Sequence, residues 1–340
     1  YTLCRTHINS CDFALGNYAY NETPGDVALK QFDIGRDRRW LIPMIKDAQA
    51  VPGARFRLLA SPWSPPAWMK TTGQMNFGGK LKPEYRDAWA LYFAKYIEAY
   101  AAEGIPIWGV TVQNEPAATQ TWDSCLYSAE EERDFVRDHL GPTLTRRGHE
   151  DVKIVIWDHN KEILFERAEP VFSDPEAAKY VWGVGFHWYT GDHFDQLDRV
   201  HEAFPQAKLL FTEGCQDGGL HLDDWGIGER SGHDIIGDLN HWSVGWIDWN
   251  MVLDTQGGPN HASNWCVAPV IAKPETGEVY YTPLYHVLAQ FSKYIRPGAV
   301  RIGVDSVPDE LMVTAFKNED GGIAVAMLNQ SDSEVPYAVE

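Results

Sequence analysis

The amino-acid sequence predicts an α/β fold, namely a (β/α)8 barrel whose first strand is missing from the sequence, followed by an all-β appendage. Seven apolar segments of strand length alternate with helical patterns over most of the 340 residues. Most of these segments are nearly continuous in apolar residues, as parallel strands buried on both faces should be. After Arg296 the pattern changes to period-two segments separated by turns rich in Asp, Gly and Ser.

Each predicted strand is a short apolar run bounded by turn or helix signals. In chain order these runs are LCRTHI from Leu3, RFRLLASP from Arg55, IPIWGVTVQ from Ile105, VKIVIW from Val152, VWGVGFHW from Val181, KLLFTE from Lys208 and SVGWIDWN from Ser243. Seven strands in this alternation indicate a TIM barrel that lacks one strand.

Helices are predicted between the strands. From Pro83 to Gly104 aromatic and aliphatic residues recur at helical spacing, with Pro at the start and Gly at the end. Ser128 and Glu131 form a capping box that opens a helix running toward Leu140. Further helices are predicted over residues 192–204, 229–242 and 283–294.

The change of pattern divides the chain into a barrel over residues 1–295 and the start of a second, all-β domain over residues 296–340. The predicted strands of the second domain are RIGVDSV, LMVTAFKNE, GGIAVAMLNQ and EVPYAVE. The sequence has no initiator Met and opens inside a strand, so we expect a chain that is truncated at its start. The last domain has no clear closing strand, and we expect it to be cut short as well.

Composition excludes several classes of protein. The chain has 29 Lys plus Arg against 48 Asp plus Glu, a net charge of −19, which argues against nucleic acid and against anionic membrane surfaces as partners. No run of about twenty apolar residues is present, so we expect no integral membrane segment. The 5 cysteines form no CxxC pair and favour buried free thiols over a disulfide framework. The 14 Trp are a weak pointer to carbohydrate.

In a barrel of this type the reactive residues lie at the carboxyl ends of the strands, where the loops build one cleft. Reading only those positions collects side chains that hydrogen-bond to sugars or stack on them. They are Arg5, Asp12, Ser61, Pro62, Trp63, Asn114, Glu115, Asp158, His187, Tyr189, Glu213, Trp249 and Asn250.

Two glutamates stand out in this set. Glu115 closes the segment VTVQNEP and Glu213 closes LLFTEG. For any single acidic residue a solvated side chain is the ordinary expectation, but burial at the end of an apolar strand costs free energy unless partners or function compensate. A retaining glycosidase needs such a pair, with one carboxyl group as nucleophile and the other as acid and then base, about 5 to 5.5 Å apart.

Several blocks of sequence carry a more specific signal. They are SCDF from Ser10, LLASPWSPPAWMK from Leu58, VTVQNEP from Val110, FHWY from Phe186, FTEGC from Phe211, GWIDWN from Gly245 and GGPN from Gly257. Together and in this order they resemble glycoside hydrolase family 30, in particular the glucosylceramidase-like enzymes and their bacterial β-1,6-glucanase relatives. The resemblance covers nearly the whole chain and implies a retaining mechanism on a (β/α)8 barrel with an attached β-sandwich.

The resemblance also implies roles for individual residues. Glu115 would be the acid/base, Glu213 the nucleophile, and Asn114 the partner of the substrate 2-hydroxyl. The remaining positions would contact the sugar or support the nucleophile, and they are Arg5, Asp12, Trp63, His187, Tyr189, Trp249 and Asn264. We expect a raised pKa for Glu115, because an acid catalyst must hold its proton at working pH.

The same resemblance implies a β-glucoside or β-glucan substrate, no metal or organic cofactor, and a secreted or periplasmic protein. It leaves the oligomeric state open. After Pro116 the chain reads AATQTWDSC, which is shorter than the corresponding loop of the animal lipid-cleaving enzymes and lacks their Tyr and Phe. That difference keeps an endo-β-1,6-glucanase open as the alternative to a glucosylceramidase-like enzyme.

Two other classes of protein compete with a glycosidase. A metal hydrolase is disfavoured because the sequence has no HExxH, no paired His at helical spacing and no Cys/His cluster. A non-catalytic carbohydrate-binding barrel stays open, although both candidate catalytic glutamates are present.

Overall fold

The computed structural model describes residues 1–338, and within them a curled sheet of seven parallel strands forms the centre of the larger domain. The strands follow one another around the sheet in chain order, so each pairs with its sequence neighbours. They are β1 Leu3–Ile8, β2 Arg57–Pro62, β3 Ile107–Thr111, β4 Lys153–Asn160, β5 Val181–His187, β6 Lys208–Glu213 and β7 Ser243–Trp246. The predicted barrel is confirmed, and all its strand segments are found.

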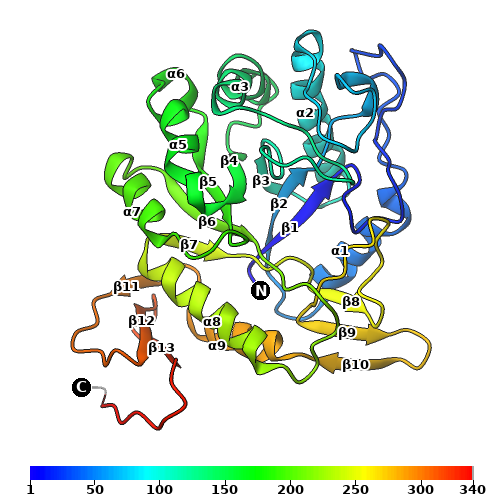
Figure 1. Ribbon diagram of the computed structural model, residues 1–340. Helices are drawn as coiled ribbons and strands as arrows, with labels where there is room; N and C mark the ends of the chain where they lie inside the picture. The colour runs from blue at the N-terminus through cyan, green and yellow to red at the C-terminus, as the bar shows by residue number, and fades with distance from the viewer. Residues whose placement is uncertain (339–340) are drawn as a thin grey trace.

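Helices pack on the outside of this sheet (Figure 1). The α-helices are α1 Leu41–Ala50, α2 Arg86–Ala102, α3 Ala129–Phe135, α4 Gly141–Arg146, α5 Leu164–Phe172, α6 Pro175–Ala178, α7 Phe194–Ala203, α8 Trp225–Asn240 and α9 Pro283–Tyr294. Short 3₁₀ helices lie at η1 Asp37–Arg39, η2 Ala67–Met69, η3 Pro83–Tyr85 and η5 Lys161–Ile163, and a π-helical turn, η4 Val136–Leu140, joins α3 to α4.

The helices form where their sequences indicate. Trp89, Tyr92, Tyr96 and Tyr100 of α2 are fully buried against the sheet, which accounts for the aromatic spacing of this segment. The Ser128 side chain accepts a hydrogen bond from the Glu131 backbone N–H, and the Glu131 side chain accepts one from the Ser128 backbone N–H, so the predicted capping box is present at the start of α3.

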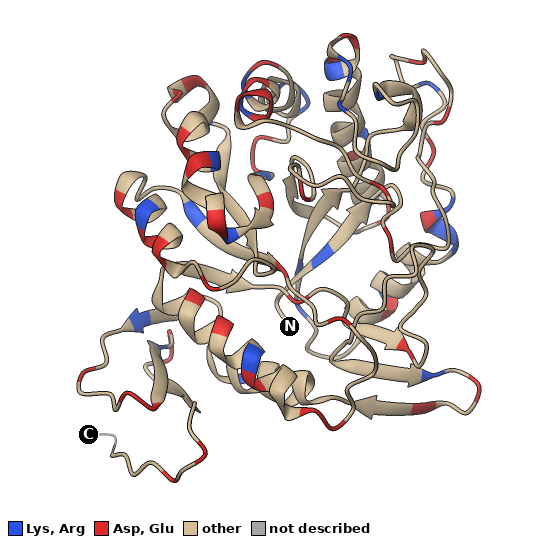
Figure 2. Cartoon of the chain, viewed as in Figure 1, with Lys and Arg blue, Asp and Glu red and all other residues tan. Residues whose placement is uncertain are grey.

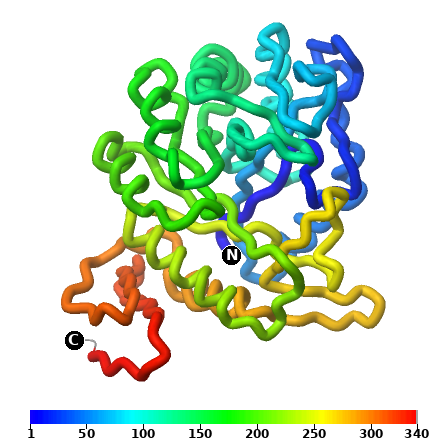
Figure 3. The backbone as a smooth tube through the Cα atoms, viewed as in Figure 1, coloured from blue at the N-terminus to red at the C-terminus, as the bar shows by residue number. Residues whose placement is uncertain are grey.

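Beyond β7 the chain builds two small sheets that cover different sides of the barrel. The first sheet consists of β8 Val252–Asp254, β9 Val270–Lys273 and β10 Glu278–Tyr281. The sequence did not predict it. An antiparallel sheet of β11 Val300–Ile302, β12 Leu311–Lys317 and β13 Ile323–Asn329 contacts α8, on the far side of α8 and α9 from the barrel strands (Figure 3).

This second sheet confirms the all-β character predicted for the C-terminal segment. The predicted last strand, EVPYAVE, is wrong over residues 334–338, which form no strand, and its last two residues lie outside the described part of the chain.

Charged side chains are spread over the helices and loops (Figure 2). Basic residues lie scattered among more numerous acidic ones, in line with the net charge of −19. Among residues 1–338, no helix has both the length and the apolar character needed to cross a membrane.

Candidate active site

Arg5 of β1 donates hydrogen bonds to side chains at or just after the carboxyl ends of four other strands. Its guanidinium donates from Nε to Ser61 Oγ over 2.8 Å and from Nη1 to Glu213 Oε2 over 2.6 Å. Nη2 donates to Asn114 Oδ1 over 2.8 Å and to Asp158 Oδ2 over 2.7 Å. Because the Arg5 side chain is only 4% exposed, these charge-assisted bonds lie shielded from water and fix the positions of their partners.

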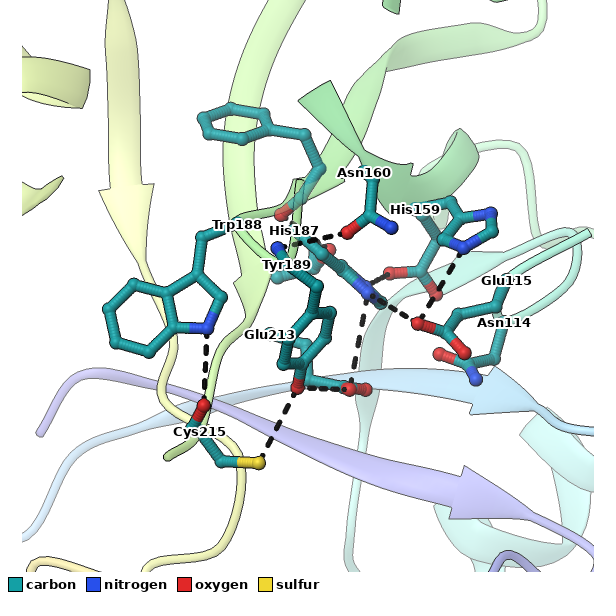
Figure 4. A network of polar contacts seen from close by, with 12 residues as sticks. Asn114, Glu115, His159, Asn160, His187, Trp188, Tyr189, Glu213 and Cys215 are labelled. Carbon is teal, nitrogen blue, oxygen red and sulfur yellow. Dashed lines mark hydrogen bonds and ion pairs between the residues drawn. The ribbon is translucent and has the colours of Figure 1, made fainter. Parts of the chain in front are cut away.

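Glu213 is the last residue of β6 and is held on both carboxylate oxygens. Arg5 donates to Oε2. The Tyr189 hydroxyl donates to Oε1 over 3.0 Å (Figure 4). Tyr189 is itself positioned by its backbone N–H, which donates to Asn160 Oδ1 over 3.0 Å. A carboxylate with two such donors is pre-oriented, as a nucleophile needs to be.

Glu115 lies in a different setting. β3 ends at Thr111, so Glu115 is on the loop after the strand and not at its end, with a left-handed backbone of φ 47°. The Glu115 backbone N–H donates to the Asp158 carbonyl over 3.1 Å, which holds the loop against β4. Its carboxylate has longer contacts than that of Glu213, at 3.4 Å to His187 Nδ1 and 3.5 Å to Gln120 Nε2.

The end of β4 is distorted so that two consecutive side chains enter the site. Trp157 and Asp158 both have positive φ, and the pairing of β4 with β5 slips between Trp157 and His159. Such a bulge re-aims side chains at the end of a strand. As a result Asp158 bonds Arg5, while His159 Nε2 lies 3.7 Å from Glu115 Oε1.

His187 at the end of β5 joins the two glutamates. Its Nε2 lies 3.0 Å from Asp158 Oδ1, and its Nδ1 lies 3.4 Å from Glu115 Oε1 and 3.9 Å from Glu213 Oε1. Although burial opposes the change, the charge on Glu213 and the hydrogen bonds to Asp158 and Glu115 raise the pKa of His187 to about 9. His187 is therefore a cation between two carboxyl groups.

The pKa values of the two glutamates are shifted in opposite directions. Burial and the charge of Glu115 raise the pKa of Glu213, despite His187 and Arg5. Burial alone would also raise the pKa of Glu115, but His187 and His159 hold it below its ordinary value. The expected raised pKa of Glu115 is therefore wrong for the free protein, because His159 joins the predicted His187 beside this carboxylate and no sequence pattern indicates that.

The other predicted sugar-contacting residues lie beside this network. The Trp63 and Trp249 rings are 5.2 Å apart at 30°, and the Arg5 guanidinium lies 4.7 Å from the Trp63 ring centre. Asp12 Oδ2 accepts from Asn264 Nδ2 over 2.9 Å. Within residues 1–338 the buried Asp12 Oδ1 has no hydrogen-bond partner, and burial raises the Asp12 pKa to about 8.

The structure thus brings the ten predicted site residues into three groups. One network joins Arg5, Asn114, Glu115, His187, Tyr189 and Glu213, the two tryptophans pack beside Arg5, and Asp12 pairs with Asn264. Sequence reasoning did not include Asp158, His159 or Gln120 among its site residues. The strand-end rule had collected Asp158, whereas nothing in the sequence marks the bulge that turns His159 inward.

Glu115, His187 and Glu213 each place one oxygen or nitrogen within 4.8 Å of the others, a spacing that a metal ion could bridge. The donors to these groups are already cationic, however, since Arg5 binds Glu213 and His187 is held protonated. A divalent cation would have to displace both positive charges. The arrangement fits proton transfer and nucleophilic attack better than metal binding.

Comparison with known proteins agrees on one family. Residues 1–295 match the Glycosyl hydrolase family 30 TIM-barrel domain, and residues 298–340 match the Glycosyl hydrolase family 30 beta sandwich domain. The chain spans about two thirds of the length of its curated relatives.

Named relatives fall into two groups. Putative glucosylceramidase 4 of Caenorhabditis elegans is 37% identical over 98% of this chain and 67% of its own. Lysosomal acid glucosylceramidase of Mus musculus is 36% identical over 100% of this chain and 69% of its own. An endo-1,6-beta-D-glucanase of Neurospora crassa is 28% identical over 100% and 73%.

Two solved structures superpose on nearly the whole of this chain. SrfJ from Salmonella typhimurium superposes with a TM-score of 0.94 at 40% identity, over 97% of this chain and 74% of that one. An endo-beta1,6-glucanase superposes with a TM-score of 0.88 at 30% identity, over 97% and 75%.

Proposed function

The chain belongs to glycoside hydrolase family 30, and from this premise we propose that it is a retaining β-glycosidase that cleaves β-glucosides by double displacement. Glu213 is the nucleophile and Glu115 the acid/base. The observation that carries the proposal is the spacing of the two carboxylates, whose oxygens approach within 4.8 Å of each other. Retaining enzymes hold their carboxyl groups about 5 to 5.5 Å apart, whereas inverting enzymes need about 6.5 to 9.5 Å to admit a water.

In the first step the Glu213 carboxylate attacks the anomeric carbon and forms an ester bond, while the bond from that carbon to the glycosidic oxygen breaks. Glu115 gives its proton to the departing oxygen. Arg5 and Tyr189 support this step because they hold Glu213 in place and favour its ionised form.

In the second step water attacks the anomeric carbon and the bond to Glu213 breaks. Glu115 removes the proton from this water and returns to its acid form. While the ester exists Glu213 carries no charge, so Glu115 has lost its anionic neighbour and its pKa falls further. His187 and His159, which hold the pKa of Glu115 below its ordinary value in the free protein, also favour the ionised form that Glu115 needs as a base.

The surrounding residues can bind the sugar. Asn114 Oδ1 accepts from Arg5, which orients the Asn114 amide so that Nδ2 can donate to the 2-hydroxyl. Asp12 Oδ1 is a buried polar atom without a partner among residues 1–338, which a sugar hydroxyl can satisfy, and the part-exposed Trp249 ring, backed by the buried Trp63, supplies a flat apolar face. These four residues would bind the glucose unit, whichever group it is attached to.

For the leaving group we propose a glucosylceramidase-like preference, supported by the 36–37% identity to proteins named as glucosylceramidases. The alternative, an endo-β-1,6-glucanase, is supported by the named glucanases at 28% and 30% identity and by the short loop after Pro116.

The test is a product assay that offers the protein glucosylceramide in detergent micelles and, separately, a soluble β-1,6-glucan. Release of glucose and ceramide supports the lipid preference, and release of short glucan oligosaccharides replaces it with the alternative. Absence of turnover on both, with binding to either, would favour the non-catalytic carbohydrate-binding barrel.

A further inference from the structure

Two cysteines and an aspartate form a cluster beside the candidate nucleophile that the proposed reaction does not use. The Cys215 and Cys266 sulfurs lie 2.9 Å apart, and both are free thiols. Asp217 Oδ1 lies 3.5 Å from the Cys266 sulfur and 3.9 Å from the Cys215 sulfur. All three ligand atoms lie within 4.8 Å of one another. We refer to Cys215, Asp217 and Cys266 as the thiol cluster.

The fold brings the cluster together through two loops that pair like short antiparallel strands. Asp217 and Cys266 face each other in an isolated β-bridge. The Val267 N–H donates to the Gln216 carbonyl over 2.9 Å, and the Gly218 N–H donates to the Trp265 carbonyl over 3.1 Å. These backbone bonds fix the cluster independently of any contact between its side chains.

The two cysteines of the thiol cluster are packed among apolar side chains, whereas its aspartate is exposed to solvent. Both cysteines pack in a small core with Leu253, Ala268 and Ile271, and they are 9% and 1% exposed. Asp217 is exposed, so the cluster is reached from solvent on the Asp217 side. A buried sulfur pair with a carboxylate at its mouth is suited to a small cation and excludes bulky molecules.

Two of the three ligand distances in the thiol cluster fit a tetrahedral metal site, and the third requires a small movement. With Zn–S bonds of about 2.3 Å and Zn–O bonds of about 2.0 Å, tetrahedral ligands stand about 3.5 Å apart for sulfur and oxygen and about 3.8 Å apart for two sulfurs. The observed sulfur–oxygen distances of 3.5 and 3.9 Å already fit. The sulfurs must separate by about 0.9 Å, which rotation of one cysteine side chain supplies.

The cluster also touches the candidate nucleophile through one side chain. The Tyr189 hydroxyl, which donates to Glu213 over 3.0 Å, lies 3.6 Å from the Cys215 sulfur (Figure 4). A hydroxyl has one proton to donate. When a metal replaces the thiol proton, the sulfur becomes an anionic acceptor that competes with Glu213 for the proton of Tyr189.

We propose that Cys215, Cys266 and Asp217 bind a thiophilic divalent cation of the Zn²⁺ class, and that the bound cation inhibits the enzyme by drawing the Tyr189 hydroxyl away from Glu213. Two thiols each lose a proton to solvent and two metal–sulfur bonds form, so no oxidant or reductant takes part. The fourth position is left for water or for Asn264 Oδ1, which lies 3.8 Å from the Cys266 sulfur. The inhibition depends on the proposed function of Glu213, whereas the binding does not.

The test is a Zn²⁺ titration of the protein by calorimetry, after treatment with a chelator and in the presence of a phosphine reductant that keeps the thiols reduced. We expect one Zn²⁺ per chain, and a Kd at least tenfold weaker for Cys266→Ser and for Asp217→Asn. Cys125→Ser is the matched control, since Cys125 is an equally buried thiol outside the cluster, and we expect it to bind like the parent. Asp217→Asn is an exposed change, so it keeps the test valid if Cys266→Ser does not fold.

Turnover of a β-glucoside is then measured with and without Zn²⁺. We expect kcat of the parent and of Cys125→Ser to fall at least fivefold with saturating Zn²⁺, and that of Cys266→Ser to change less than twofold. Equal Zn²⁺ affinity in the parent, Cys266→Ser and Asp217→Asn would overturn the site. Tight binding that leaves kcat unchanged would overturn the coupling through Tyr189. Cysteine-dependent binding in a protein without any glycosidase activity would overturn the proposed function and leave the site in place.

Discussion

Glu213 and Glu115 face each other across the candidate site but are held in opposite ways. Glu213 ends a strand and receives hydrogen bonds of 2.6 and 3.0 Å from Arg5 and Tyr189. Glu115 lies on a loop, and its carboxylate contacts His187, Gln120 and His159 at 3.4 to 3.7 Å. A nucleophile works best when fixed and ionised, whereas a group that gives and takes a proton needs a looser setting. The difference in attachment is consistent with the roles proposed for the two glutamates.

Replacing Glu213, the tightly held carboxylate, is expected to lower kcat more than replacing Glu115, Tyr189 or His159. Glu213→Gln removes the attacking anion and leaves the buried Arg5 without one of its two carboxylate partners, so kcat on any β-glucoside should fall by about 10⁴-fold or more. Intact-protein mass spectrometry should then show no glycosyl adduct from an activated fluoroglycoside.

Glu202→Gln is the matched control, because Glu202 is an exposed carboxylate on α7 and should keep the parent activity. A glycosyl adduct that still forms on Glu213→Gln would assign the nucleophile to another residue.

Replacing the loosely held carboxylate should have an effect that depends on the leaving group. Glu115→Gln is expected to slow hydrolysis of unactivated glycosides by about 10² to 10⁴-fold, because proton transfer is lost. With a dinitrophenyl β-glucoside, which needs no acid to leave, the glycosyl enzyme should accumulate, and added azide should speed its release. Turnover of unactivated substrates at the parent rate would reverse the role given to Glu115.

The hydrogen bond from Tyr189 to Glu213 should matter less than either carboxylate. A bond to a charged group contributes about 1.5 to 3 kcal/mol, so Tyr189→Phe is expected to lower kcat about 10- to 100-fold. Tyr281→Phe, at a tyrosine that is 55% exposed on β10, is the control and should leave kcat unchanged. Equal kcat values for the two variants would show that Glu213 does not depend on Tyr189.

Replacing His159 is expected to have the smallest effect, seen as a shift in the pH dependence of kcat/KM. His159 helps to hold the pKa of Glu115 below its ordinary value, so His159→Asn should raise that pKa. In the free protein Glu115 has the lower and Glu213 the higher pKa, so Glu115 sets the acidic limb of kcat/KM, and that limb should move up by less than about 1 pH unit. Burial lowers the pKa of His159 itself, so its influence is confined to acid. An acidic limb that stays in place or moves down would contradict this sign.

The parts of the site that sequence could predict are those set by strand order. His187 and Glu213 are the last residues of β5 and β6, and the strand-end rule finds them because parallel strands bring their carboxyl ends to one rim. Arg5 lies in the middle of β1, Leu3–Ile8, and reaches Glu213 through its guanidinium. Glu115 was placed at a strand end, but β3 stops at Thr111 and the loop that follows brings the carboxylate back through its bond to the Asp158 carbonyl.

The rest of the site and of the fold depends on contacts between residues far apart in the sequence, which no local sequence pattern indicates. His159 enters the site only because β4 bulges at Trp157 and Asp158, which take positive φ. The buried Glu132 supports that bulge by accepting the Trp157 N–H over 2.9 Å, from a helix 25 positions earlier in the chain. The sheet β8–β10 was missed because its strands have three or four residues each, too short for a periodic signal.

The most direct test of the paired glutamates is the anomeric configuration of the first product, followed by proton NMR during hydrolysis of a β-glucoside by the parent protein. One oxygen of each carboxylate lies within 4.8 Å of the other, closer than the about 6.5 to 9.5 Å of inverting enzymes, so we expect the attack to come from Glu213 itself. The account predicts that the β-anomer appears first and only later equilibrates with the α-anomer. Initial release of the α-anomer would contradict the double-displacement mechanism and the roles given to both glutamates.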